Sequence, residues 1–272
     1  MEGLAELVAL LRDRRVAVLT GAGISTESGI PDYRGPKTRH QPRRPIQHRE
    51  FIRDAAVRRR YWARATTGWP RFAAARPNDG HVALASLQDI GVVGGLITQN
   101  VDRLHHAAGS SALELHGTLH EVVCLACGAL EPRDSVHARM VERNPDFAAQ
   151  VRAVAPDGDV DLDPAVVMRF DPAPCRRCGG PLKPHVVFFG GSVRRALVEA
   201  AYALVDEADV LLVVGSSLTV FSGYRFVRRA AERRTPVAIV NLGPTRGDPH
   251  ATLRVDATAG TILPRLVASM AK

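Results

Sequence analysis

The stretch that decides the fold runs from Val16 to Gly29 and reads VAVLTGAGISTESG. Its apolar beginning is typical of a short strand buried on both faces of a parallel sheet. A glycine-rich turn with Gly21 and Gly23 follows, which allows the backbone to approach a phosphate at the start of a helix. The pattern favours a nucleotide-binding turn over a plain strand-to-helix turn, although Thr26 stands where dehydrogenases have a third glycine.

Three further apolar runs, at 95–98, 210–214 and 237–240, share this pattern. Small or polar residues follow each run: Gln99 to Asp102, Gly215 to Ser217, and Asn241 to Gly243. Helices are expected between the runs, for example at 194–207 and 222–234. The alternation predicts an α/β fold, a Rossmann-like parallel sheet with helices on both faces. Ligands of such sheets bind beyond the carboxyl ends of the strands, where these polar residues lie.

The middle of the chain breaks this rhythm, because it holds two cysteine pairs, the loop 155–159 and several prolines. We therefore expect a small module inserted into one catalytic domain that spans residues 1–272. The expected boundaries are a Rossmann-like core at 1–36, 80–120 and 184–272, a helical or loop insert at 37–79, and a zinc module at 121–183.

All four cysteines occur in Cys-x-x-Cys pairs: Cys124, Cys127, Cys175 and Cys178. Gly128 and Gly179 follow the pairs and suit the turn around a metal. Four thiolates complete a tetrahedron around Zn²⁺ and leave no open coordination position. The spacing predicts one structural zinc ion, with free thiols or disulfides as the alternatives.

The composition is that of an ordinary globular protein, with 46% hydrophobic and 24% charged residues and no apolar run long enough to cross a bilayer. Glu2 and Glu6 argue against a secretory leader, so we expect a cytoplasmic location. The net charge of +8 comes almost wholly from arginine, which is dense only at 39–60. A general preference for arginine explains this charge, while a role in holding phosphates or an acidic peptide stays open.

His116 lies in the stretch ELHG, just before the first cysteine pair. Histidine titrates near neutral pH and can act as a general base. One histidine among ten is by itself more often structural, and spacing alone does not separate the two roles.

Taken together, these motifs resemble the sirtuins, the NAD-dependent protein deacylases. The matching stretches lie in family order at 20–35, 98–102, 114–117, the two cysteine pairs, 215–217 and 241–243. The similarity spans about residues 5 to 268. Four further stretches resemble the class II branch, to which a mitochondrial mammalian sirtuin belongs: 44–48, 60–64, 155–160 and 222–226.

The resemblance implies a reaction with NAD as co-substrate. The acyl-lysine oxygen attacks the ribose carbon as nicotinamide leaves, and His116 serves as general base, with Asn100 and Asp102 also catalytic. The products are free lysine, nicotinamide and O-acyl-ADP-ribose. The residues implied to bind NAD are Gly21, Ala22, Gly23, Ser25, Ile30, Asp32, Arg34, Gln99, Asn100, Val101, Asp102, Gly215, Ser216, Ser217, Asn241, Leu242, Gly243 and Ala259.

The resemblance also implies how the substrate binds. Its backbone would add as a strand beside Val186, Val187, Phe188 and Phe189. Tyr61 and Arg64 form a Tyr-x-x-Arg pair, which in some sirtuins binds an acidic acyl chain through a charge-assisted hydrogen bond. An exposed helical arginine is an equal alternative. The acyl preference is therefore open, and four residues depart from the family pattern: Tyr33, Gly35, His185 and Gly191.

Three other functions are compatible with parts of the pattern. A dehydrogenase would require an acidic residue about 20 positions after the glycine turn, where Gln41 and basic residues stand. A zinc-ribbon nucleic-acid binder would show binding that weakens steeply with salt. A protein ADP-ribosyltransferase or an NAD sensor would keep the same fold. We expect a monomer whose partners are acyl-lysine proteins or peptides, with no membrane and no nucleic acid.

Overall fold

The computed structural model describes residues 3–32, 45–145, 147, 162 and 164–270. The chain forms two compact units. Unit 1 contains residues 1–42, 76–115 and 193–272, and unit 2 contains residues 43–75 and 116–192. Within the described ranges, every helix is too short or too polar to span a bilayer.

Unit 1 is built on a six-stranded sheet in which every neighbouring pair is parallel and the strand order is β3-β2-β1-β7-β8-β9. The strands are β1 (Val16–Thr20), β2 (Val93–Thr98), β3 (Leu113–Glu114), β7 (Val210–Val214), β8 (Val237–Val240) and β9 (Leu253–Val255). The chain moves outward from β1 to β3 and then returns to β7 on the other side of β1. The order thus reverses between β1 and β7, which is where open α/β sheets bind their ligands.

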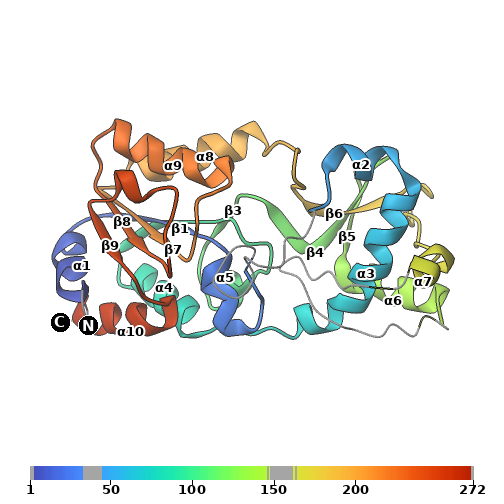
Figure 1. Ribbon diagram of the computed structural model, residues 1–272, viewed down its shortest axis with the longest axis horizontal. Helices are drawn as coiled ribbons and strands as arrows, with labels where there is room; N and C mark the ends of the chain where they lie inside the picture. Colours follow the sequence, from blue (N-terminus) through green and yellow to red (C-terminus); the bar gives the residue numbers. More distant parts are fainter. Residues whose placement is uncertain (1–2, 33–44, 146, 148–161, 163, 271–272) are drawn as a thin grey trace. The chain divides into compact units, whose positions relative to one another are not determined.

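Helices cover both faces of this sheet (Figure 1). Along β1, Val16 and Val18 belong to one apolar core, and Ala17 and Leu19 belong to the other. The first core lies under α1 (Leu4–Leu11), α4 (Asp79–Asp89) and α10 (Ala259–Met270), and the second under α8 (Arg195–Asp206) and α9 (Phe221–Glu232). Shorter elements are η1 (Ala22–Ser28), α5 (Leu104–Ala107) and η2 (Asp248–His250). The predicted Rossmann-like parallel sheet with helices on both faces is confirmed.

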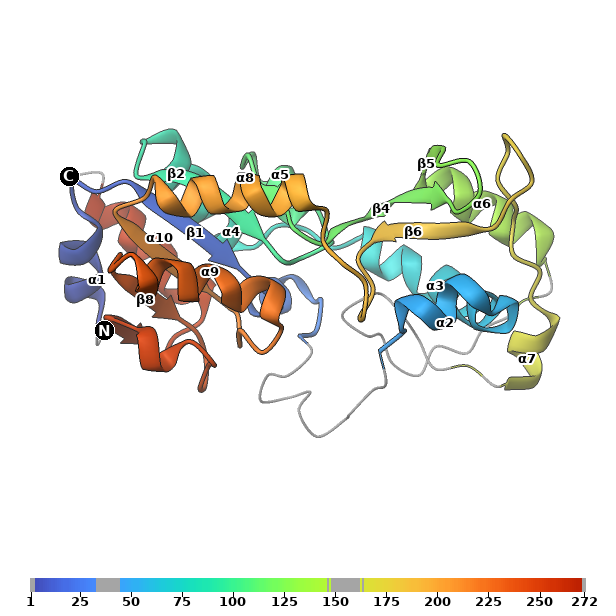
Figure 2. The same ribbon diagram turned by 90° about the horizontal axis from the view of Figure 1, so that it is seen from above.

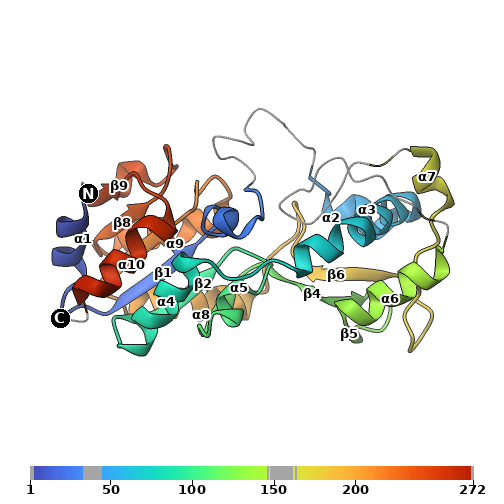
Figure 3. The same cartoon turned by 90° about the horizontal axis from the view of Figure 1, so that it is seen from below.

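Unit 2 contains a three-stranded antiparallel sheet in the order β5-β4-β6. Its elements are α2 (His48–Arg53), α3 (Ala55–Ala73), β4 (Gly117–Cys124), β5 (Leu130–Pro132), α6 (Arg133–Arg143), α7 (Pro164–Arg169) and β6 (Leu182–Val186). Figure 2 and Figure 3 show β4 and β6 running side by side. Trp62 of α3 is buried and its Nε1 donates to Leu182 O on β6 at 3.0 Å. This packing unites residues 43–75 with 116–192. The sequence pattern instead predicts an insert at 37–79, a separate zinc module at 121–183, and residues 116–120 and 184–192 in the Rossmann-like core.

A buried cation ties α6 to α3. The Arg133 guanidinium lies between the rings of Trp62 and Trp69, at 4.9 and 4.8 Å from their centroids. It also donates to Ala65 O at 2.8 Å. Burial lowers the pKa of Arg133, and the neighbouring Tyr61 hydroxyl offsets part of that effect. The two indole faces replace some of the hydration that the cation loses.

The turns after β1 and β7 approach each other backbone to backbone. Gly23 N donates to Gly215 O at 2.8 Å. A Cβ at Gly215, where φ is +60, would lie 2.4 Å from Ile24 N. A Cβ at Gly21 would lie 2.7 Å from Ser216 Cβ, and one at Gly23 would lie 2.8 Å from Gly215 O. Packing of the two turns therefore requires these glycines, whether or not a ligand also requires them.

Replacing Gly215 by alanine should destabilise the chain far more than replacing Gly91. Both residues have positive φ, but a Cβ at Gly91 meets nothing within 4 Å. We expect Gly91→Ala to lower the free energy of unfolding by about 1 kcal/mol. Gly215→Ala adds the clash with Ile24 and should cost about 3 kcal/mol or more. Urea unfolding without NAD measures both, and equal losses would contradict the close approach of the two turns.

Candidate active site

A buried network of hydrogen bonds links the turn after β1 to the end of β2. Ser25, Asn100 and Asp102 are 1%, 8% and 7% exposed. Ser25 Oγ donates to Asp102 Oδ2 at 2.7 Å, and Asn100 Nδ2 donates to Ser25 Oγ and to Gly21 O, each at 3.1 Å. Asp102 Oδ1 accepts from Leu104 N at 2.9 Å. The structure thus brings Ser25 against Asn100 and Asp102, which lie 75 and 77 positions further along the sequence.

Gln99 and Ser216 form a second pair beside this network. Gln99 Nε2 donates to Ser216 Oγ at 2.8 Å and to Thr20 O at 3.3 Å. The amide fits because Gly223, in α9, has no side chain. A Cβ at that position would lie 2.3 Å from Gln99 Oε1. Gly223 therefore leaves the room in which the amide of Gln99 links the ends of β1 and β7.

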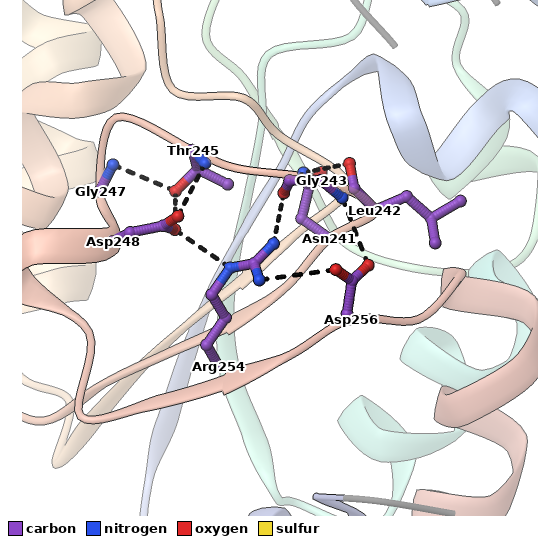
Figure 4. A network of polar contacts seen from close by, with 8 residues as sticks. All are labelled: Asn241, Leu242, Gly243, Thr245, Gly247, Asp248, Arg254 and Asp256. Carbon is purple, nitrogen blue, oxygen red and sulfur yellow. Dashed lines mark hydrogen bonds and ion pairs between the residues drawn. The ribbon is translucent and has the colours of Figure 1, made fainter. Parts of the chain in front are cut away.

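The loop after β8 is braced by an arginine from β9 (Figure 4). Arg254 lies between two carboxylates, with Nε 3.3 Å from Asp248 Oδ1 and Nη1 3.6 Å from Asp256 Oδ2. Its Nη2 donates to Gly243 O. Asn241 Nδ2 donates to Leu242 O at 2.9 Å and to Gly243 O at 3.0 Å. The loop that contains the predicted NAD-binding residues Asn241, Leu242 and Gly243 is therefore held by ionic contacts that the sequence pattern did not reveal.

The other predicted NAD-binding residues also belong to unit 1. Ile30 is buried and its N–H donates to Ser25 O at 3.2 Å. Ser217 Oγ lies 3.1 Å from Thr219 Oγ1. Ala259 lies in the apolar core beside Gly80. Ala22, Asp32 and Val101 are half-buried, and Arg34 lies outside the described residues, as do Tyr33 and Gly35. The amide, hydroxyl and carboxylate groups at these strand ends suit the sugar hydroxyls and carboxamide of NAD.

In unit 2, the backbone of His116 is bonded to the predicted substrate strand. Val187 N donates to His116 O at 2.9 Å. The next residue, Gly117, pairs with Val186 and has φ +74. A Cβ at Gly117 would lie 2.1 Å from His185 O, so only glycine fits between the strands. The predicted general base and the predicted peptide-binding strand therefore belong to one rigid local structure.

Aromatic rings pack around Phe188 in the same unit. The Phe188 centroid lies 5.0 Å from that of Phe51 and 5.6 Å from that of Tyr61. Lys183 Nζ lies 4.5 Å from the Phe188 centroid and donates to Pro184 O at 2.9 Å. Burial lowers the pKa of Lys183 to about 8.

The predicted Tyr-x-x-Arg pair lies on α3, where the two side chains differ in burial. Tyr61 is buried against Phe51, Trp62 and Phe188, and Arg64 is half-buried. A second cation, Arg133, lies close to Tyr61. Whether Arg64 binds an acyl chain thus stays a prediction. His185, one of the residues that depart from the family pattern, has a polar partner, since its Nδ1 lies 2.9 Å from Glu121 Oε2.

The four cysteines meet at one end of unit 2. Their sulfur atoms all lie within 4.8 Å of one another. Cys124 Sγ lies 3.5 Å from Cys178 Sγ, and Cys127 Sγ lies 3.8 Å from Cys175 Sγ. A tetrahedron with Zn–S bonds of about 2.3 Å has edges of about 3.8 Å. The four thiols fit a structural zinc site, which would tie the turn after β4 to the turn before β6.

Two histidines that the sequence did not single out lie beneath the Ser25 network. His81 and His105 are 0% and 1% exposed, and their ring centroids lie 4.8 Å apart. His105 Nε2 lies 2.9 Å from Thr20 Oγ1, whose hydroxyl donates to Thr98 Oγ1 at 2.9 Å. Burial lowers the pKa of His81 to about 4 and that of His105 to about 3. Both rings are therefore neutral at pH 7.

Comparison with known proteins agrees with this geometry. A sequence model of the Sir2 family matches residues 21–222. The chain is 51% identical over 255 residues to the NAD-dependent protein lipoamidase sirtuin-4, mitochondrial, of Bos taurus, covering 92% of this chain and 81% of that protein. It is 52% identical over 264 residues to the NAD-dependent protein deacetylase 1 of Mycobacterium avium (strain 104), covering 95% and 92%. A solved Sir2–p53 peptide–NAD⁺ complex has a TM-score of 0.78 and 30% identity, over 97% of each chain.

Polar groups at the switch point of a parallel sheet are the mark of a nucleotide-binding α/β protein. The matches cover most of the chain at about half identity, which narrows this class to one family. The chain belongs to the Sir2 family of NAD-dependent protein deacylases.

Each cysteine should be required to retain one zinc ion. We expect one zinc per chain by elemental mass spectrometry, and loss of that zinc in Cys124→Ser or Cys175→Ser. Because the binding free energy of a structural zinc ion adds to the free energy of folding, these variants should also melt at lower temperature. Arg177→Ser is a matched control, since it alters the same turn and removes no thiolate. Full zinc retention in either cysteine variant would contradict the four-thiolate site.

Acid should destabilise the fold through the two buried histidines. Their folded pKa values lie below the unfolded value of about 6.5, so the unfolded chain binds more protons as the pH falls below 6.5. The contribution of His81, about 3 kcal/mol, is therefore lost from pH 6.5 down to about 4, and that of His105 from pH 6.5 down to about 3. His81→Gln should flatten the plot of unfolding free energy against pH by about 1.4 kcal/mol per pH unit near pH 5. An unchanged slope would show that His81 is protonated in the folded chain.

Proposed function

We propose that this chain removes acyl groups from protein lysines with NAD as co-substrate, and that His116 is the general base. The observation that carries the proposal is the buried Ser25–Asn100–Asp102 network at the switch point of the sheet. Such a network supplies fixed dipoles where a sugar carbon gains positive charge. Family membership and the solved complex with NAD and a peptide support the same function.

The two units would bind different reactants. In unit 1, Asn100 and Asp102 orient the nicotinamide end of NAD, and Asn241 with Ser216 binds the adenosine half. In unit 2, the backbone of Val186 to Phe189 pairs with the peptide, while Phe188 and Tyr61 exclude water from the acyl-lysine. The acyl oxygen bonds to the ribose carbon as nicotinamide departs. His116 would take a proton from a ribose hydroxyl, whose oxygen then bonds to the acyl carbon. After addition of one water, the bond from that carbon to the lysine nitrogen breaks, which releases free lysine and leaves the acyl group on ADP-ribose.

We also make proposals about the acyl preference, the oligomeric state and the location of this protein. The sirtuin-4 relative named a lipoamidase makes lipoyl a chain to test beside acetyl, and Arg64 with Tyr61 makes acidic chains a third class. The apolar cores of both units are closed by the chain's own helices, which supports a monomer. The bacterial relative supports a cytoplasmic location, whereas the bovine relative is named mitochondrial.

The proposed function is tested by mass spectrometry of NAD with a panel of acyl-lysine peptides: acetyl, succinyl, glutaryl, methylglutaryl, lipoyl and long-chain. We expect NAD-dependent loss of at least one acyl group, with the matching O-acyl-ADP-ribose. His116→Ala should lower kcat/KM about 100-fold or more, because the general base is lost. His250→Ala, an exposed histidine of unit 1, should retain activity.

Two outcomes would contradict the proposal. If the chain bound NAD but deacylated none of the peptides, an NAD sensor would be the remaining function. ADP-ribose retained on protein, with the acyl groups intact, would indicate a transferase. If His116→Ala were as active as the wild type, only the proposed role of His116 as general base would be refuted.

A further inference from the structure

The N-terminus of α4 is hydrogen-bonded to the turn that contains Ser25. Asn78 is the N-cap of α4, and its Oδ1 accepts from Gly80 N at 2.9 Å. Its Nδ2 donates in the other direction, to Ile24 O and to Ser28 Oγ, each at 2.8 Å. These two bonds flank Ser25 in the chain. The cap of one helix therefore also holds the short helix η1 on either side of Ser25.

His81 completes this cap with one edge of its ring. Asn78 N donates to His81 Nδ1 at 3.3 Å, which forms a reciprocal capping box. Because Nδ1 accepts a hydrogen, a neutral ring must carry its proton on Nε2. Burial lowers the pKa of His81 to about 4, so the ring is neutral at working pH. The helix cap thus decides the tautomer of a histidine at the base of the proposed NAD site.

The opposite edge of the ring faces Ser25. His81 Nε2 lies 3.5 Å from Ser25 Oγ, and in this tautomer it donates. Asn100 Nδ2 donates to the same oxygen at 3.1 Å. With two donors on its lone pairs, the Ser25 hydroxyl has one direction left for its hydrogen, toward Asp102 Oδ2 at 2.7 Å. The bond from His81 is longer than the other two.

We propose that His81 is a positioning residue of the reaction, which acts through Ser25 to orient the carboxylate of Asp102. The inference rests on the proposed function, because Asp102 is assigned to the nicotinamide end of NAD there. His81 acts through its contact with Ser25, a predicted NAD-binding residue, and its Nε2–H directs the Ser25 hydrogen. The chain His81–Ser25–Asp102 is assembled from α4, η1 and the residues after β2.

Two substitutions of His81 test the roles of Nδ1 and Nε2 separately. Asparagine can replace the Nδ1 acceptor of the cap but lacks a donor near Ser25, whereas glutamine places an amide N–H near the position of Nε2. We expect His81→Asn to weaken NAD binding about tenfold in calorimetry, the loss of one buried hydrogen bond. His81→Gln should stay within about threefold of the wild type. In a Ser25→Ala background, His81→Asn should cause no further loss, because the partner through which it acts is gone.

His105→Asn is the matched control, since it removes a donor from an equally buried histidine that faces Thr20 instead of Ser25. It should lower the melting temperature without the tenfold loss of NAD affinity. Three outcomes would overturn the proposal: equal losses in His81→Asn and His81→Gln, the full loss persisting in Ser25→Ala, or the same loss in His105→Asn.

A measurement on the unaltered chain keeps the proposal testable if the variants do not fold. Two-bond ¹H–¹⁵N spectra of the labelled protein report which ring nitrogen carries the proton. We expect His81 to be protonated at Nε2, and protonation at Nδ1 would overturn the proposal. These readouts need no acyl peptide. Failure of deacylation with intact NAD binding would therefore refute the proposed function and leave the positioning role standing.

Discussion

The burial of the Asp102 carboxylate is the constraint on which the proposed NAD site depends. A carboxylate that is 7% exposed requires hydrogen-bond donors, because unpaired burial of a charge is strongly unfavourable. Ser25 and Leu104 supply those donors, which brings the turn after β1 against the end of β2. The turn can reach this position only because glycines let it approach the turn after β7. The buried carboxylate thus links the ends of β1 and β2, and the close glycine turns link the end of β1 to that of β7.

Unit 2 holds the predicted substrate-binding strand and His116 in one local structure. His116 directly precedes β4, and its carbonyl accepts a hydrogen bond from Val187 N, just beyond the end of β6. The glycine after His116 permits this close pairing. The four cysteines lie at the far ends of β4 and β6, where Cys124 and Cys175 are part of the apolar core of unit 2. A metal there would fix the strands that carry the proposed general base and the proposed peptide-binding residues.

The sequence revealed those parts of the structure that depend on local pattern. Continuous apolar runs marked β1, β2, β7 and β8, and the spacing of the cysteines marked the metal site. His81 was missed because a histidine in the first turn of a helix is ordinary, and its burial arises only when α4 packs on η1. The union of α3 with β6 was missed for a related reason, since the contact between Trp62 and Leu182 joins residues 120 positions apart. The glycines were assigned to phosphate approach, and the structure adds a second reason in the contact between two turns.

The fate of the acyl group distinguishes a deacylase from every other enzyme that this fold supports. The most direct measurement is a single-turnover mass balance with NAD and a peptide whose lysine carries a ¹³C-labelled acyl group. We predict that the label leaves lysine and appears on ADP-ribose, with one nicotinamide released for each acyl group transferred. Label found as a free carboxylic acid from the start, or ADP-ribose on the protein with the label still on lysine, would contradict the assigned chemistry.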